Sequence, residues 1–478
     1  VLIGGLTGDA LTDADENVAV GTSALGADTL GSKSTAIGAS ALNAQNFTTA
    51  TDTYNVAVGY YAGVAVTTGQ YNTLIGGLAG DSITTGDHNV ALGVSCLQAN
   101  TTANKNVALG SNALSSFNVT TDTDTYNTAV GYAAGTAVST GVQNTLIGGI
   151  SGDALTGGYY NVALGHSSLT SDTVGYGSVS IGTGTLAAQN FTTATWTYNT
   201  AVGYGTGAAI TTGKNNTLIG GLAGDALTDA DANVAVGYLS LTADTLGSKS
   251  IAIGQQALTT QNFTTATDAH NIAIGYQAGA AVTTGTDNTL IGGLAGDALT
   301  EGTLNTVVGK IALGADTKGS RAVAIGRNAL GSQNFTTATA NYNVAVGYSA
   351  GGTISTGTNN TFVGGLAGDA TDDGGYNVAV GSGALSANCG DSNTAVGTSA
   401  ALVCTGADNT VVGANAGYAL TSGTNNLFLG HDAGRTGSPG GNMTTQVNTI
   451  VMGDENIGAA NIQVDWTVAS DQRDKTDF

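Results

Sequence analysis

The chain is poor in the residues that would mark several familiar classes of protein. It has one proline and three cysteines in 478 residues, and only 9% of its residues are charged. No apolar stretch reaches the roughly 18 residues of a membrane-spanning helix, and no signal peptide is recognisable, so we expect no membrane span. Lysine and arginine number 11 against 33 acidic residues, and the net charge of −22 makes nucleic acid an unexpected partner.

The three cysteines are too few for a disulfide framework. Cys96 occupies a position where other repeats carry alanine, which predicts a buried structural residue. Cys389 and Cys404 follow consecutive repeat glycines by eight and seven residues, so they are expected close together on adjacent turns. A bridge and two free thiols both fit that spacing.

Glycine, by contrast, is abundant at 75 residues, and many glycines close a five-residue kernel, Asn-x-Ala/Leu-Val/Ile-Gly. The kernel occurs at Asn55–Gly59 and again at Asn72–Gly76. Its glycines are 17 residues apart in seventeen intervals, 21 apart in five and 16 apart in two, which predicts stacked repeats, here called rungs. The kernel glycines are residues 4, 21, 38, 59, 76, 93, 110, 131, 148, 165, 182, 203, 220, 237, 254, 275, 292, 309, 326, 347, 364, 381, 397, 413 and 430.

A longer period of 72 residues is superimposed on the rungs. Each larger block contains three intervals of 17 residues and one of 21, and the chain begins at Val1 inside a repeat. We infer that the chain grew by duplication of four-rung blocks, and we expect it to be a fragment or a processed product. The 21-residue intervals begin at glycines 38, 110, 182, 254 and 326.

The kernel has the pattern of a strand that is apolar on both faces. The central Ala or Leu points one way with Asn, and the flanking Val, Thr or Ile point the other. Such a strand must be covered on both sides, once by the interior of the coil and once by identical chains around an axis. The sequence therefore predicts an all-β, repetitive parallel β-solenoid of about 25 rungs of 16–21 residues, which assembles with identical chains around an axis.

Asparagine stands four residues before the kernel glycine in 20 of the 24 rungs from Gly21 to Gly430. Stacked asparagines can hydrogen-bond from rung to rung, so we expect a buried structural ladder. The rest of each rung alternates threonine with small apolar residues and is expected to form a short outer strand and a turn. The ladder includes Asn55, Asn72, Asn89, Asn127 and Asn144.

Each 21-residue interval carries a lateral insertion loop that is rich in aromatic residues. A regular row of such loops would bind a repeated glycan, or would clasp a neighbouring subunit, and the sequence leaves both open. Each loop also contains an Asn-x-Thr sequon, at Asn46, Asn118, Asn190, Asn262 and Asn334. The candidate binding residues are Phe47, Tyr54, Phe191, Trp196, Tyr198, Phe263, Phe335 and Tyr342.

Two rungs carry a motif known from cell-surface adhesins. Residues 34–41 (STAIGASA) and 250–257 (SIAIGQQA) resemble the head repeats of trimeric autotransporter adhesins, which read Ser-x-Ala-Ile-Gly-x-x-Ala. That resemblance implies a trimeric, left-handed parallel β-roll and extends loosely over residues 1–434. The rungs here are longer than the family's repeat, so the cross-section is expected to differ.

The end of the chain carries a second resemblance. After a loop that holds the one proline, Ser470-Asp471-Gln472-Arg473-Asp474-Lys475 resembles the junction of phage tail fibres and tailspikes with a self-cleaving C-terminal chaperone. The resemblance implies that Ser470 is the nucleophile and Lys475 its base. We expect three regions, a shaft at 1–434, a β-rich junction at 435–469 and the start of a missing chaperone at 470–478.

Together these features favour a structural protein, the trimeric shaft or adhesin of a phage tail fibre that supports host attachment. Its expected partners are two further copies of itself, other tail proteins and a host-surface glycan or receptor. We expect no enzyme beyond vestigial cleavage at Ser470-Asp471, no cofactor and no metal. A microbial cell-surface adhesin or appendage is the alternative. A polysaccharide-cleaving solenoid would need a unique pair of carboxylates, which the sequence does not offer.

Overall fold

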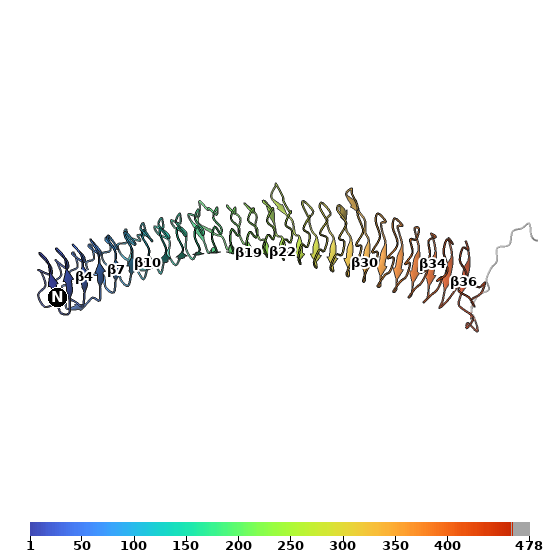
Figure 1. Ribbon diagram of the computed structural model, residues 1–478, viewed down its shortest axis with the longest axis horizontal. Helices are drawn as coiled ribbons and strands as arrows, with labels where there is room; N and C mark the ends of the chain where they lie inside the picture. The colour runs from blue at the N-terminus through green and yellow to red at the C-terminus, as the bar shows by residue number, and fades with distance from the viewer. Residues whose placement is uncertain (460, 462–478) are drawn as a thin grey trace, which may run out of the picture. The chain divides into compact units, whose positions relative to one another are not determined.

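The computed structural model describes residues 1–459 and 461 and is all-β. Every regular element in these residues is a short strand, so the described part holds no helix that could cross a membrane. The chain divides into two compact units, residues 1–324 with 334–340, and residues 325–333 with 341–478. Each unit is a parallel β-solenoid, and the chain makes about 25 turns, as the repeat spacing predicts (Figure 1).

In the first unit, each rung contributes the three residues before its kernel glycine to one parallel sheet. The strands pair in register, so that Ala57 lies opposite Leu74 and Leu74 opposite Ala91. The strands are β1 (Leu2–Ile3), β2 (Val18–Val20), β4 (Thr35–Ile37), β6 (Val56–Val58), β7 (Thr73–Ile75), β8 (Val90–Leu92), β10 (Val107–Leu109), β12 (Thr128–Val130), β13 (Thr145–Ile147), β14 (Val162–Leu164), β16 (Val179–Ile181), β18 (Thr200–Val202), β19 (Thr217–Ile219), β20 (Val234–Val236), β22 (Ile251–Ile253), β24 (Ile272–Ile274), β25 (Thr289–Ile291) and β26 (Thr306–Val308).

The second unit repeats this construction with bulkier core residues. Phe362 lies opposite Ala345 on one side and Ala379 on the other. The kernel-like segment after the proline loop forms one more paired strand, so a further rung follows residue 434. Its strands are β30 (Val344–Val346), β31 (Thr361–Val363), β32 (Val378–Val380), β33 (Thr394–Val396), β34 (Thr410–Val412), β35 (Leu427–Leu429) and β36 (Ile450–Met452), and β28 (Val323–Ile325) lies where the chain passes between the units.

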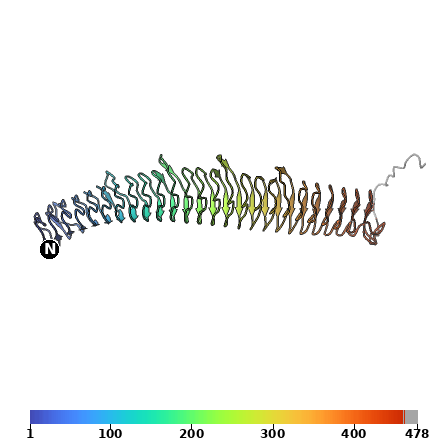
Figure 2. The same ribbon diagram turned by 45° about the horizontal axis from the view of Figure 1, so that its top comes forward.

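The insertion loops add a small second sheet to each block of the first unit. The extra residues form a two-residue strand that pairs in parallel with a strand of the preceding rung, and several of these loops stand out beyond the ordinary turns (Figure 2). The pairs are β3 (Gly31–Ser32) with β5 (Thr51–Asp52), β9 (Ala103–Asn104) with β11 (Thr123–Asp124), β15 (Gly175–Tyr176) with β17 (Thr195–Trp196), β21 (Gly247–Ser248) with β23 (Thr267–Asp268), and β27 (Gly319–Ser320) with β29 (Thr339–Ala340).

The prediction of an outer strand in every rung was wrong. Between kernels the chain turns repeatedly, with positive φ at the kernel glycine (Gly59, 142°), two residues later (Tyr61, 59°) and just before the next asparagine (Tyr71, 55°). These conformations interrupt an extended strand. Adjacent rungs nevertheless remain hydrogen-bonded there, as from the Thr67 N–H to the Thr84 carbonyl at 2.9 Å.

The predicted alternation of faces is confirmed. The central strand residues, such as Ala57 and Leu74, are fully buried, whereas the flanking residues of the same strands are half-buried or exposed. Large side chains inside the coil lie next to glycines of neighbouring turns. A methyl group on Gly63 or Gly80 would lie 2.6 or 2.9 Å from a methyl carbon of Leu74, so these glycines make room for the leucine.

Candidate functional site

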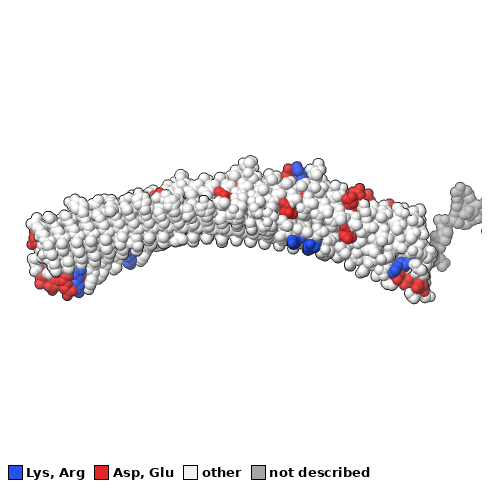
Figure 3. All heavy atoms as spheres, viewed as in Figure 1, with Lys and Arg blue, Asp and Glu red and all other residues white. Residues whose placement is uncertain are grey.

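The outer face of the sheet is a continuous row of apolar side chains. The residue just before the kernel glycine points outward in each strand and is half-buried in some rungs and exposed in others. Charged side chains are few on the face drawn in Figure 3 and lie in separate groups. A long apolar sheet face of this kind is a typical protein interface. Its exposed members include Ile37, Leu92, Leu164, Ile219 and Ile253 in the first unit and Val363, Val380, Val396 and Val412 in the second.

The base of an insertion loop is tied into the core by a buried polar network. In the first block, one carboxylate oxygen of Asp28 accepts the N–H groups of Gly31 and Phe47 at 3.1 and 3.2 Å. Its other oxygen accepts the Gln45 amide at 2.6 Å, and the Gln45 carbonyl oxygen accepts the Asn55 amide at 2.9 Å. The first loop is therefore held at both ends by buried hydrogen bonds for which water does not compete.

The same network recurs in the third and fourth blocks. Asp172 and Asp244 accept the amides of Gln189 and Gln261, each at 2.6 Å. Burial raises the pKa of both carboxyl groups, although their hydrogen bonds oppose the rise. Sequence reasoning missed these aspartates, but their recurrence at multiples of 72 residues was a usable signal.

The predicted aromatic binding residues fall into two groups. Tyr54, Trp196, Tyr198 and Tyr342 are exposed over 45–58% of their surface. The phenylalanines are instead 5–6% exposed and pack inside the loops, so a role in ligand contact does not fit their burial. Sequence reasoning could not separate the groups, because both occur in the same loops. The buried ones are Phe47, Phe191, Phe263 and Phe335.

The exposed aromatic residues form stacks that run from rung to rung. The position before the kernel asparagine carries Tyr54, Tyr71 and His88, whose ring centroids are 5.5 and 4.7 Å apart in succession. In the third block, Trp196 stacks on Tyr160 at 5.8 Å and on Tyr198 at 5.4 Å. The first of these stacks comes from the equal register of the rungs, which places equivalent side chains above one another.

Trp196 takes the place of an ion pair found in other blocks. Lys33 bonds to Asp52 at 2.7 Å, and Lys105 bonds to Asp124 at 2.5 Å. In the third block the lysine position holds Gly177, whose missing side chain leaves room for the Trp196 ring at 3.2 Å from the ideal Cβ position. The third block therefore presents an uncharged aromatic surface where its neighbours present charge.

The predicted asparagine ladder residues are all buried, and their bonding is more specific than side-chain stacking. The Oδ1 of Asn55 accepts the backbone N–H of Asn72 at 2.9 Å, and the Oδ1 of Asn72 accepts that of Asn89 at 3.0 Å. The Asn72 amide donates to the Gly86 carbonyl at 2.8 Å. Asn127 and Asn144 repeat the pattern at 3.0 Å. The ladder satisfies buried backbone groups, which is a structural role.

All three cysteines are free and buried. Cys96 takes the position of a core alanine, as expected from the repeat. Burial raises the pKa of Cys96 to about 12 and that of Cys404 to about 11, and it also raises the pKa of Cys389. The Thr371 hydroxyl lies 3.3 Å from the Cys389 sulfur.

We expect the three thiols to resist alkylation in the folded chain. At pH 8.5 an ordinary cysteine is about half thiolate, whereas a thiol with the raised pKa of Cys404 is a thiolate in well under one molecule in a hundred. Intact-mass spectrometry after iodoacetamide treatment should show no adduct on native protein and three adducts in guanidinium chloride. A single adduct after denaturation without reductant would instead show that Cys389 and Cys404 are bridged.

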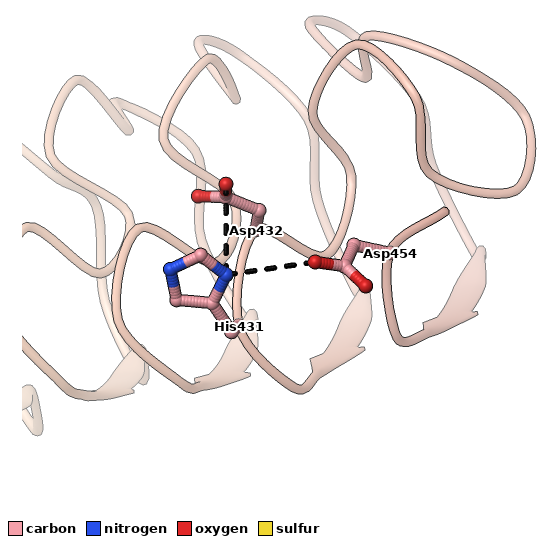
Figure 4. Close-up of side chains that lie close together, drawn as sticks. All are labelled: His431, Asp432 and Asp454. Carbon is pink, nitrogen blue, oxygen red and sulfur yellow. Dashed lines mark ion pairs between the residues drawn. The ribbon is translucent and has the colours of Figure 1, made fainter. Parts of the chain in front are cut away.

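Among the described residues, one group of side chains brings possible metal ligands together. His431 Nδ1 lies 3.6 Å from carboxylate oxygens of Asp432 and Asp454 (Figure 4). The Arg435 guanidinium lowers the pKa of Asp432, and the Asn456 N–H lowers that of Asp454. Both carboxylates thus have protein partners and the imidazole is 63% exposed, so we interpret the trio as an ion-pair cluster between adjacent rungs.

The predicted cleavage pair, Ser470 and Lys475, lies outside the described residues, and its role stays a prediction. No protein-family model, curated protein or solved structure matches this chain. Two surface features are candidates for an interaction. One is the apolar sheet face, and the other is the pair of insertion loops in the second and third blocks, whose sequences differ from the other loops.

Proposed function

We propose that the chain is the shaft of a trimeric fibre, most closely of the phage tail-fibre kind, which supports attachment to a host surface. The carrying observation is the apolar outer face of the sheet, which is uninterrupted within each unit. Three copies that bury this face around one axis would remove it from water and leave the insertion loops outside. Localisation in the virion and contact with other tail proteins belong to the same proposal.

The chemistry of the rest of the chain supports a mechanical role. Asp28, Asp172 and Asp244 serve as loop anchors, each bonded to the side-chain amide of a glutamine. The phage assignment depends on the resemblance of Ser470–Lys475 to the chaperone junction, whereas the trimer depends on the sheet face. The two parts of the proposal can therefore fail separately.

The native mass of the purified chain tests the trimer. Multi-angle light scattering should give three times 46.6 kDa, and the complex should resist SDS until it is boiled. A stable monomer would contradict the proposal, because the apolar face would then be exposed to water without destabilising the chain. A cell-surface appendage would give the same trimer, so tail-fibre assignment needs a second measurement, the presence of the chain in purified virions.

Charges placed on the sheet face should dissociate the trimer. The triple variant Leu92→Glu, Leu164→Glu, Ile219→Glu would bury unpaired carboxylates, and each costs several kcal/mol, about 3–5 by analogy with a broken buried pair. We expect light scattering to report monomers at micromolar concentration, with the circular dichroism spectrum unchanged.

The matched control adds the same charge to exposed threonines of the insertion loops, Thr192→Glu, Thr264→Glu and Thr336→Glu. This control should remain trimeric. If the loop variant dissociates and the sheet-face variant does not, the loops form the subunit contact, and the arrangement proposed here is wrong.

A further inference from the structure

The second block carries a groove lined by valine, threonine and tyrosine side chains. It has a volume of about 370 Å³ and lies beside the second insertion loop. Its lining residues come from that loop and from the two following rungs. They are Val119, Thr121, Thr123, Thr125, Thr140, Val142, Tyr159 and Tyr160.

A difference in sequence between the second loop and the other four loops accounts for the groove. Four loops carry a phenylalanine directly after the sequon asparagine, and each is packed inward. The second loop carries Val119 there, and its aromatic ring has moved two residues earlier to Phe117, which is fully buried at the position of Gln45. Valine fills less of the loop than phenylalanine, so space remains open beside it.

The buried network has changed together with the loop. Where the first block has the Asp28 and Gln45 pair, the second has Asn100 and Phe117. Asn100 bonds to the backbone of Ala103 at 3.0 Å through both its oxygen and its nitrogen, and so needs no glutamine partner. The replacement of both residues keeps the loop anchored to the core. The groove therefore lies beside an anchored loop and belongs to the ordered structure of the second block.

The lining combines aromatic rings with hydroxyl groups and contains no charged side chain. The exposed hydroxyls of Thr121 and Thr123 share one hydrogen bond at 3.0 Å and keep further capacity for a ligand, whereas the Thr125 hydroxyl is bonded to Asn104 and Asn106. The rings of Tyr159 and Tyr160 complete the lining.

A neutral pyranose has the complementary chemistry. One face of its ring is largely C–H and packs on aromatic rings, while its hydroxyls exchange hydrogen bonds with threonines. Tyr160 also stacks on Trp196, so the aromatic surface continues beyond the groove to the aromatic residues of the third insertion loop.

We propose that this groove binds a neutral saccharide of one or two sugar units, with Tyr159 and Tyr160 as the packing surface and Thr121 and Thr123 as hydrogen-bonding groups. The volume lies at the lower end of the range of small-molecule sites, roughly 300–1,000 Å³, which sets the size of the ligand. The inference gives the proposed attachment function a ligand class and rests on that function for its biological role. A trimer would present three such grooves, so weak sites would act together on a surface glycan.

Tryptophan fluorescence gives a direct test on the full chain. A Trp466→Phe background leaves Trp196 as the single tryptophan, and Trp196 reports on the groove through its contact with Tyr160. The probes are methyl glycosides of glucose, galactose, mannose and N-acetylglucosamine, with sialic acid as the charged comparison. We expect saturable titration by at least one neutral glycoside in the millimolar range, checked by calorimetry, and none by sialic acid.

Val119→Phe is the decisive variant, because it restores the residue that the other four loops carry and fills the groove. It should weaken saccharide binding at least tenfold. Thr123→Val, which keeps the shape and removes a hydroxyl, should weaken binding about 3- to 10-fold, the loss of one hydrogen bond. Tyr276→Ala, at an exposed tyrosine outside the groove, is the control and should bind as the parent chain does.

The outcomes separate this inference from the fibre proposal. If the chain is a trimer but binds none of the glycosides, the groove proposal is wrong and the fibre proposal stands. The same conclusion follows if the Val119→Phe variant binds as tightly as the parent chain. If the chain is a monomer that binds saccharide, and the Val119→Phe variant no longer binds it, the fibre proposal is wrong and the groove proposal stands. If Val119→Phe fails to fold by circular dichroism, Thr123→Val decides, and unchanged binding there overturns the proposal.

Discussion

Replacing Gly76 by alanine is expected to break the solenoid at that rung. Gly76 has a φ of +136°, a region that side chains avoid, and an added Cβ would lie 2.3 Å from the carbonyl oxygen of Gly93 in the next rung. The obstructing atom is backbone, so no side-chain rotation relieves the contact. Strain alone contributes about 1–3 kcal/mol, and the clash adds to it, so we expect a loss of at least about 3 kcal/mol.

The change should be visible as local opening before global unfolding, because each rung contacts only its neighbours. Limited proteolysis is expected to cut the variant near residue 76, with a lowered midpoint in thermal unfolding. The adjacent Gly77→Ala is the control, since its Cβ would meet nothing closer than the Tyr60 carbonyl oxygen at 3.9 Å. Equal effects of the two substitutions would contradict the assigned role of the kernel glycine.

Replacing Asn216 by alanine should have the second large effect. The Oδ1 of Asn216 accepts the N–H of Asn233 at 3.0 Å, and its amide donates to the Ala230 carbonyl at 2.8 Å. Alanine leaves that N–H and that carbonyl buried without partners. Each orphaned group costs about 1–3 kcal/mol, so we expect roughly 2–6 kcal/mol in all. Hydrogen exchange should show the Asn233 amide losing its protection.

Asn215 provides the matched control, because it precedes Asn216 and is exposed. Asn215→Ser should change the thermal midpoint little, since Ser392 adopts the same left-handed conformation at the equivalent position, with φ of 61° against 59°. A stability loss for Asn215→Ser as large as that for Asn216→Ala would show that the ladder bonds are not what stabilises the rung.

Repetition made the fold predictable. The spacing of the kernel glycines gave the number of turns, and the alternation within Asn55–Gly59 gave the buried and outward faces. The outer strand was predicted wrongly because threonine-rich alternation is typical of a strand, and nothing in the sequence marks Tyr61 or Tyr71 as residues with positive φ. Non-glycine residues are held in that conformation by the bonds between rungs, which a single rung does not reveal.

The candidate site was much less predictable, for a related reason. Phe47 and Tyr54 belong to one loop, yet one is buried and the other exposed, and their order in the sequence does not separate them. The groove depends on Val119, where a residue is smaller than its counterparts and leaves space. Such a space becomes visible only when the walls contributed by Val142, Tyr159 and Tyr160 are in place.

The short separation of paired strands along the chain shapes how the protein folds. Val56 pairs with Thr73 and Thr73 with Val90, so every strand finds its partner one rung away. Closing such a short loop costs little chain entropy, and each completed rung offers the template for the next. Assembly of the coil is therefore a growth process within one polypeptide. The N-terminal rungs can be complete while later ones are still being synthesised on the ribosome. Adding rungs does not lengthen the conformational search, because each new strand pairs with the one before it.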